Sequence, residues 1–180
     1  LIRIIIENDI RISLSDILAL GNDAADIEDL KYFIHQRMKV FLRDQSLRHD
    51  LIDACLSLDE GNDLALSVKK SFALTDFIKT SDGANLIQGF KRANNILLQA
   101  EQKDGVEYSY GAESKYAEDG AEHNLFYALD NEEVKIRSAL EREDFVEAMN
   151  SMANLRTPID SFFETVQINS DVDVIRRNRL

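Results

Sequence analysis

The chain has 180 residues, of which 44% are hydrophobic and 30% are charged, and its net charge is −12. This length and composition predict one globular domain with room for a short appended element. The negative charge excludes a protein that coats nucleic acid indiscriminately, although a local basic surface remains compatible with it.

The single cysteine, Cys55, excludes an internal disulfide framework and is typical of a cytoplasmic protein. The apolar run at residues 1–6 is too short to cross a bilayer or to act as a signal peptide, so we expect no membrane association. Because the first residue is not methionine, we expect the chain to be a piece of a longer protein.

Residues 1–25 predict a helical lead-in. Ser13 or Ser15 is suited to cap a short helix, which we expect to stop at residues 21–22 because glycine and asparagine end helices. The main domain is then expected at residues 26–180.

The first long helix is expected at residues 26–45. Arg37 falls in the middle of its apolar face, and a buried arginine needs an acidic partner, for which Asp50 and Asp53 are candidates. The predicted apolar face consists of Leu30, Phe33, Ile34, Met38 and Phe41.

The opposite side of this helix carries a stripe of positive or titratable groups. A solvated face is the commoner explanation of such a stripe, but solvated faces usually mix signs and this one contains no acid. The stripe consists of Lys31, His35, Lys39 and Arg43.

A second long helix, at residues 84–102, has one apolar face and one polar face without an acid. Cations and amides together can contact phosphates and base edges. A soluble face rich in amides is the other interpretation, and the sequence leaves both open. The polar face consists of Gln88, Lys91, Arg92, Asn95, Gln99 and Gln102.

Glycines and tyrosines at residues 104–121 predict a loop, and helices are expected at residues 122–130, 132–142 and 144–155. Residues 101–147 contain fourteen acidic and five basic side chains. This region would repel a polyanion, whereas the basic helices would attract one.

The only proline, Pro158, indicates a corner between two helices. Thr157 is suited to cap a new helix there, with Pro158 in its first position and Asp160 as the acidic half of a capping box. The last helix, within residues 171–180, is expected to present Arg176, Arg177 and Arg179.

No catalytic or nucleotide-binding motif is found, and no nucleophile is paired with a base. His49 and Asp50 lack further ligands at metal-binding spacing, so no metal site is predicted. The helical periodicity throughout the chain predicts an all-α fold, a helical bundle.

Four segments resemble, in order, the C-terminal region of the beta subunit of bacterial tetrameric glycyl-tRNA synthetase. They are FLRDQSLRHDLIDACL at 41–56, DGANLIQGFKRANNIL at 82–97, NLRTPIDSFFETVQIN at 154–169 and IRRNRL at 175–180. The last two segments are similar to the end of the helical anticodon-binding (DALR) domain that the family shares with arginyl-tRNA synthetase. Residues 91–97 favour the glycyl beta subunit, whereas Phe90 departs from the polar residue expected there.

This resemblance implies an all-helical, DALR-like bundle that binds tRNA(Gly) in the cytoplasm. It also implies that the alpha subunit of an alpha2beta2 enzyme carries the site that uses ATP and glycine, so no cofactor is expected in this chain. The chain would thus support the ATP-dependent attachment of glycine to tRNA without catalysing it.

An anticodon is a single-stranded loop that is read by stacking and hydrogen bonds, for which a few cations and amides suffice. The alternative function is a non-catalytic helical module that docks protein partners within a larger assembly. Salt-dependent binding that prefers tRNA(Gly) would separate the two. The residues expected to face tRNA are Lys91, Arg92 and Asn95, with Lys39, Arg43, Arg176 and Arg179 as backbone contacts.

Overall fold

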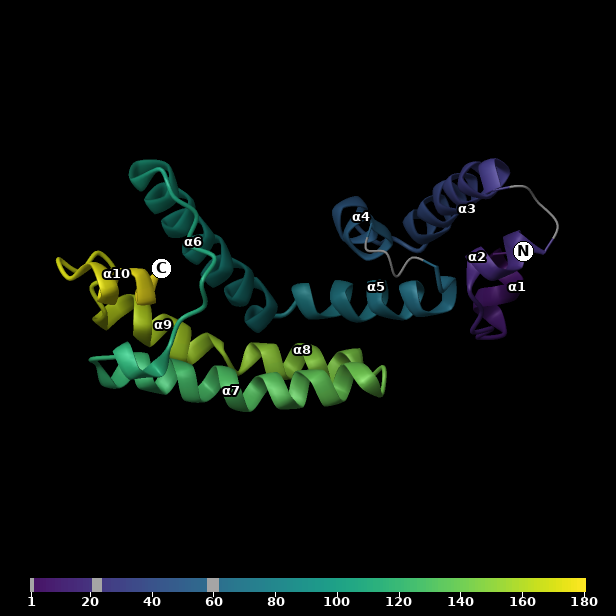
Figure 1. Cartoon of the computed structure of the whole chain (residues 1–180). Coiled ribbons are helices and arrows are strands. Elements are labelled where there is room, and N and C mark those ends of the chain that lie inside the picture. Colours follow the sequence, from purple (N-terminus) through teal and green to yellow (C-terminus); the bar gives the residue numbers. More distant parts are fainter. Residues whose placement is uncertain (1, 21–23, 58–61) are drawn as a thin grey trace. The chain divides into compact units, whose positions relative to one another are not determined.

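The computed structural model describes residues 2–20, 24–57 and 62–180, and every regular element in these ranges is a helix. The predicted all-α class is therefore confirmed. The chain divides into two compact units, Leu1–Phe77 and Ile78–Leu180, which are described separately below (Figure 1). The helix stop predicted at residues 21–22 lies outside the described residues.

Unit 1 is built around α3. Its elements are α1 (Ile2–Glu7), α2 (Leu14–Ala19), α3 (Ala24–Asp44), α4 (His49–Ser57) and α5 (Leu64–Ile78), the last of which ends at the start of unit 2. Large aliphatic side chains from all five helices form one core, in which Met38 and Leu42 of α3 are fully buried. Burial of such side chains is the main stabilising contribution in this unit.

The amino-terminal helices belong to unit 1. The Ser13 hydroxyl accepts a hydrogen bond from the Asp16 amide at 3.1 Å and caps α2, as the sequence predicts. The Leu14 amide donates to the Asn62 carbonyl at 2.8 Å, which ties α2 to the start of α5. Helices α1 and α2 both pack on α3, within the same compact unit.

Arg37 is exposed, so the predicted buried ion pair with Asp50 or Asp53 is wrong. Its guanidinium carbon lies 5.3 Å from the centroid of the Phe33 ring, and that ring is itself 54% exposed. The core face of α3 runs through Ile34, Met38 and Leu42, with Leu30 and Phe41 partly buried against it, so of the predicted apolar face only Phe33 lies outside the core.

Unit 2 is a bundle around a helical hairpin. Its elements are α6 (Ser81–Asp104), the 3₁₀ turn η1 (Ser114–Tyr116), α7 (Gly120–Glu141), α8 (Phe145–Ala153), α9 (Arg156–Thr165) and α10 (Asp173–Arg179). Helices α7 and α8 run side by side, α9 packs on α7, and α6 packs on α8 and α9 (Figure 1).

The α7–α8 hairpin is joined through small side chains. Ala139 and Ala148 are fully buried, which lets the two backbones approach closely. The turn is completed by Glu143 in the left-handed region, at φ 58°, and by Asp144, whose carboxylate accepts from the Glu147 amide at 2.9 Å. The predicted break between residues 130 and 132 is absent, since α7 runs through Asn131, whose side-chain amide donates to the Tyr127 carbonyl one turn earlier.

The corner at Pro158 forms differently from the prediction. Helix α9 begins at Arg156, and the preceding Leu155 keeps a right-handed helical conformation with no side-chain cap. Pro158 therefore lies at the third helical position, where a missing amide hydrogen still costs no intrahelical bond. Asp160 faces Arg156 at 3.6 Å instead of closing a capping box with Thr157.

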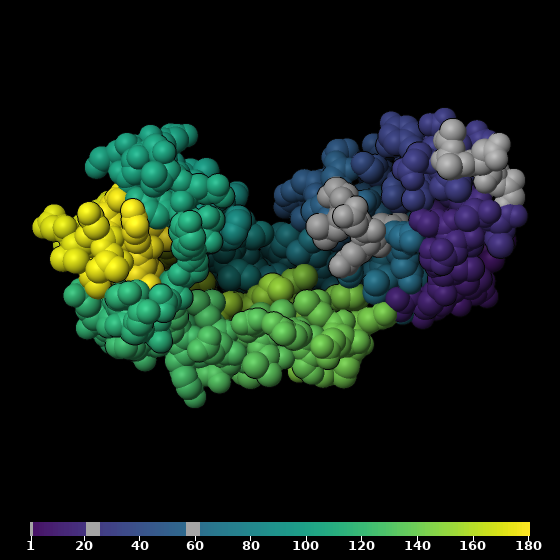
Figure 2. Space-filling model, in the orientation of Figure 1, coloured from purple at the N-terminus to yellow at the C-terminus, as the bar shows by residue number. Residues whose placement is uncertain are grey.

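The loop at residues 105–119 connects α6 to α7 and lies against α10, as the space-filling view shows (Figure 2). Gly105 ends α6 in the left-handed region at φ 66°, a conformation that favours glycine. Apart from η1 the loop has no regular structure, so side-chain bonds to α6, α7 and α10 hold it.

Candidate nucleic-acid interface

The polar face of α6 is exposed to solvent. Residues 91–95 are all exposed, and they include Lys91, Arg92 and Asn95. The helix begins after Thr80, whose hydroxyl accepts from the Gly83 amide at 3.0 Å, and it remains regular for 24 residues. Its length and its packing on α8 and α9 through the opposite face hold the polar side chains outward.

The three central residues of this face differ in their contacts. Within the part of the chain that the structure describes, Lys91 and Asn95 make no hydrogen bond or ion pair to the protein. Arg92 lies with its guanidinium carbon 4.5 Å from the centroid of the Phe163 ring and donates to the Phe163 carbonyl at 3.3 Å. Arg92 is thus oriented by α9 while its charge stays at the surface.

The cations predicted on α3 belong to unit 1 and are partly neutralised. Lys39 forms an ion pair with Asp53 of α4 at 2.6 Å, and this hydrogen bond lowers the pKa of Asp53. Lys31 pairs with Glu28 at 3.0 Å, whereas Arg43 is exposed. The acids that pair with these lysines are Asp53 of the next helix, α4, and Glu28, one turn earlier on α3 itself.

The carboxyl-terminal arginines are engaged inside unit 2. Arg176 forms an ion pair with Asp104 at 2.6 Å and donates to the Tyr108 hydroxyl at 2.9 Å, and only 18% of its side chain is exposed. The Tyr108 hydroxyl and Arg176 both donate to the Asp104 carboxylate and lower its pKa. Arg176 therefore holds the end of α6 and the start of the 105–119 loop together.

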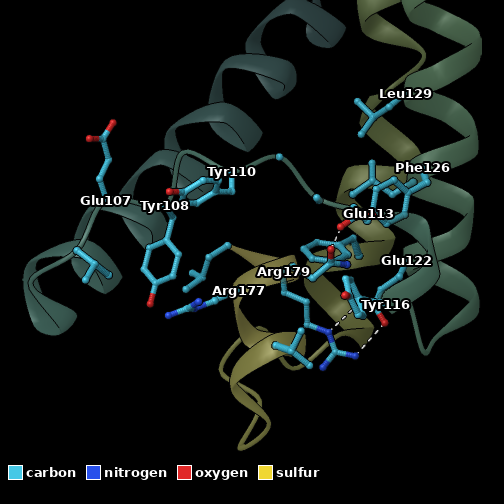
Figure 3. A pocket seen from close by; sticks show the side chains of 18 residues that line it. Glu107, Tyr108, Tyr110, Glu113, Tyr116, Glu122, Phe126, Leu129, Arg177 and Arg179 are labelled. Atoms are coloured by element: carbon cyan, nitrogen blue, oxygen red, sulfur yellow. Dashed lines mark hydrogen bonds and ion pairs between the residues drawn. The ribbon is translucent and has the colours of Figure 1, made fainter.

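Arg179 is buried more deeply than Arg176. Its guanidinium donates to both oxygens of Glu122, at 2.7 and 2.8 Å, and the Glu122 residue is 2% exposed. The hydrogen bonds from Arg179 lower the pKa of Glu122 from 4.5 to about 2, aided by the amides of Glu118 and Asp119, although burial opposes the shift. Figure 3 shows this ion pair among the side chains that line a cavity. That either arginine contacts tRNA stays a prediction, but both have a structural role.

The cavity beside this ion pair has a volume of about 510 Å³. We call it the loop cavity, since the 105–119 loop forms one wall and α7 and α10 form the others (Figure 3). Its lining is mostly apolar and aromatic, and sequence reasoning did not find it. The tyrosines of the loop were the available signal. The aromatic and cationic lining residues are Tyr108, Tyr110, Tyr116, Phe126, Phe162, Arg177 and Arg179.

A second apolar groove of about 540 Å³ lies between α6 and α9. Phe90, the predicted departure from the family, lines it and is 69% exposed. Ile159 and Phe162 of α9 line the other side.

The described residues contain no group of three or more metal-binding side chains, and none of their helices is long and apolar enough to cross a membrane. The imidazole of His49 lies 3.0 Å from Asp53, while Asp50 pairs with Arg48 at 2.6 Å. His49 and Asp50 thus bind different partners.

No protein-family model matches the chain. The glycine–tRNA ligase beta subunit of Ruegeria sp. (strain TM1040) is 57% identical over 179 residues, covering 99% of this chain and 26% of the relative. The corresponding subunit of Paracoccus denitrificans (strain Pd 1222) is 54% identical with the same coverage. That of Rhodospirillum centenum (strain ATCC 51521 / SW) is 41% identical over 187 residues, again covering 99% and 26%. The chain spans about a quarter of the length of these relatives.

Proposed function

Because the chain belongs to the family of glycine–tRNA ligase beta subunits, we propose that it is a tRNA-binding part of such a subunit. In this proposal it supports the ATP-dependent attachment of glycine to tRNA(Gly) and recognises the anticodon region. The alpha subunit, paired with the beta subunit in an alpha2beta2 enzyme of the cytoplasm, would carry the site for ATP and glycine. Unit 2 would then correspond to the DALR-like anticodon-binding domain.

The observation that carries this proposal is the exposed polar face of α6. It contains no acid in a chain with 33 acidic residues, and Lys91 and Asn95 have no partner among the described residues. Lysine and arginine neutralise phosphates and release counterions, whereas an amide can donate to and accept from a base edge. Lys91 and Arg92 are therefore assigned to the RNA backbone and Asn95 to a base.

The test uses the full-length beta subunit with its alpha subunit and compares tRNA affinity over a range of salt concentrations. Lys91→Ala is expected to weaken binding to all tRNAs alike and to reduce the magnitude of the salt slope by about one. Asn95→Ala should instead narrow the difference in affinity between tRNA(Gly) and other tRNAs.

Arg137→Ala provides a control, since it removes a cation of α7 whose side chain is 71% exposed and which is not part of the polar face of α6. Unchanged tRNA affinity in the double variant Lys91→Ala, Arg92→Ala would contradict the assignment of this face. If Asn95→Ala lowered the melting temperature and left selectivity unchanged, Asn95 would be a structural residue.

A protein-docking role is the second candidate, and the apolar groove between α6 and α9 favours it. A side chain such as Phe90 that is 69% exposed beside an apolar groove is typical of protein interfaces. If this role replaced tRNA binding, Phe90→Ser would release a protein subunit from the enzyme, and Lys91→Ala would not change the salt slope.

A further inference from the structure

We propose that the loop cavity receives one unstacked base of a single-stranded RNA segment. This inference rests on the proposed function, because it assumes that the RNA loop is brought to unit 2. It adds a base-binding pocket formed by the 105–119 loop, α7 and α10 to the cation and amide contacts of α6.

The cavity is already formed without RNA because hydrogen bonds fix the loop that covers it. The Tyr108 amide donates to Glu101 at 3.0 Å, and the Glu113 amide donates to the Asn178 side chain of α10 at 2.7 Å. At the other end of the loop, the Glu118 and Asp119 amides both donate to Glu122, at 2.9 and 3.0 Å. A fixed loop avoids part of the entropy cost of ordering the site when a ligand binds.

Five aromatic residues from the loop, α7 and α9 line this space. Tyr110 comes from the loop, Tyr116 from η1 and Phe126 from α7. Tyr110 is 92% exposed, so its ring is free to stack on an incoming group instead of filling the core. Unstacked RNA bases are commonly held by such rings, since every base presents a π-face.

The charges around the cavity favour a segment of RNA over a neutral apolar ligand. Arg177 is exposed at its rim, and neither a hydrogen bond nor an ion pair engages it within the described residues. The carboxylates of Glu113 and Glu122 are paired, at 2.6 Å with Lys115 and at 2.7 Å with Arg179. In Figure 3 the Glu107 carboxylate points away from the other labelled side chains. A phosphate adjoining the bound base would therefore meet Arg177, and among the acids that line the cavity only Glu107 has no partner within the described residues.

The experiment uses the full-length beta subunit with its alpha subunit, and a set of tRNA(Gly) transcripts that each lack one base of the anticodon loop. Tyr110→Ala should weaken binding of the intact transcript about 5- to 150-fold, as loss of one base stack does. Tyr110→Phe keeps the ring and should retain the affinity. Tyr127→Ala is the matched control, because Tyr127 is 73% exposed on α7 and does not line the cavity.

One abasic transcript should bind the unaltered enzyme and Tyr110→Ala equally, because the base that fills the cavity is already missing. With 2-aminopurine at that position, fluorescence should be quenched on binding to the unaltered enzyme and should recover with Tyr110→Ala. The inference would be overturned if Tyr110→Ala bound the intact transcript as tightly as the unaltered enzyme does. It would also be overturned if Tyr110→Ala weakened the binding of every abasic transcript by the same factor.

These outcomes also separate the inference from the proposed function. If the unaltered enzyme binds tRNA in a salt-dependent way that Lys91→Ala weakens, while Tyr110→Ala has no effect, only the base pocket is wrong. If the unaltered enzyme shows no salt-dependent tRNA binding, both are overturned.

Discussion

Helices α6 and α10 of unit 2 both present cations, yet the two sets of charges are used differently. Arg176 and Arg179 of α10 bind carboxylates of α6 and α7 and are mostly buried. Lys91 of α6 is exposed and has no partner among the described residues. Whether a cation is available to a ligand therefore depends on acids that are distant in the sequence.

Substitutions in the two helices should therefore differ in their effect on the free energy of unfolding. A buried guanidinium must recover the cost of leaving water through its bonds to the protein, so loss of one partner leaves an uncompensated charge. An exposed lysine pays no such cost, and its substitution changes stability little. We therefore expect variants of α10 to change folding and variants of α6 to change binding.

The largest expected effect follows from Arg179→Ala, which should strip Glu122 of its partner and lower the opening free energy of this end of unit 2 by about 3–5 kcal/mol. Native-state hydrogen exchange at the Glu118 and Asp119 amides would measure it, since both donate to Glu122. The neighbouring exposed residue provides the control, and Arg177→Ala should stay within about 0.5 kcal/mol. A loss below about 1 kcal/mol for Arg179→Ala would mean that the pair behaves like a surface ion pair.

A smaller effect is expected from pH. The pKa of Glu122 is lowered from 4.5 to about 2 in the folded chain, so the folded state favours the ionised carboxylate. This contributes up to about 3 kcal/mol of stability, which is complete well above pH 4.5 and is lost as the pH falls toward 2. The same amide exchange, followed as the pH is lowered, would measure it.

In Glu122→Gln this part of the acid dependence should disappear, because a neutral amide does not titrate. If Glu122→Gln and the unaltered chain lost stability over the same pH range by the same amount, another carboxylate would be responsible.

The smallest expected effect concerns unit 1 and extends the comparison to α3. Asp53 already neutralises part of the charge of Lys39, so Lys39→Ala should reduce the magnitude of the tRNA salt slope by less than about 0.5, against about one for Lys91→Ala. Asp53→Asn frees the lysine and should raise tRNA affinity slightly. Equal salt slopes for Lys39→Ala and Lys91→Ala would show that the ion pair with Asp53 does not reduce the contribution of Lys39 to tRNA binding.

Features that depend on neighbours in the sequence were predicted well. The helices follow from the spacing of apolar residues. The cap at Ser13 follows from the sequence as well, because its hydroxyl accepts from the amide of Asp16, only three residues further on. The exposed face of α6 was also predicted, because an unbroken helix of 24 residues fixes which side chains share a side. Four of the five residues predicted for the apolar face of α3 also lie at the core, but Phe33 is exposed, and Arg37 next to that edge of the face lies outside instead of inside.

Features that depend on distant contacts were not predictable in this way. Arg179 and Glu122 are 57 residues apart, and Arg176 and the Tyr108 hydroxyl are 68 apart, so no local pattern pairs them. The loop cavity depends on these same bonds, since they position the loop. The tyrosines could suggest an unusual loop, but not that it lies against α10 and leaves a space beneath it.

The way in which the 105–119 loop is held has a consequence for motion. A segment without its own ladder of backbone hydrogen bonds cannot open residue by residue, because its order depends on the bonds from Asn178, Arg176 and Arg179. If α10 detaches, all of these bonds are lost at once. We therefore expect the loop and α10 to open as one cooperative unit, with shared exchange rates and shared exposure to proteases, while the α7–α8 hairpin stays closed.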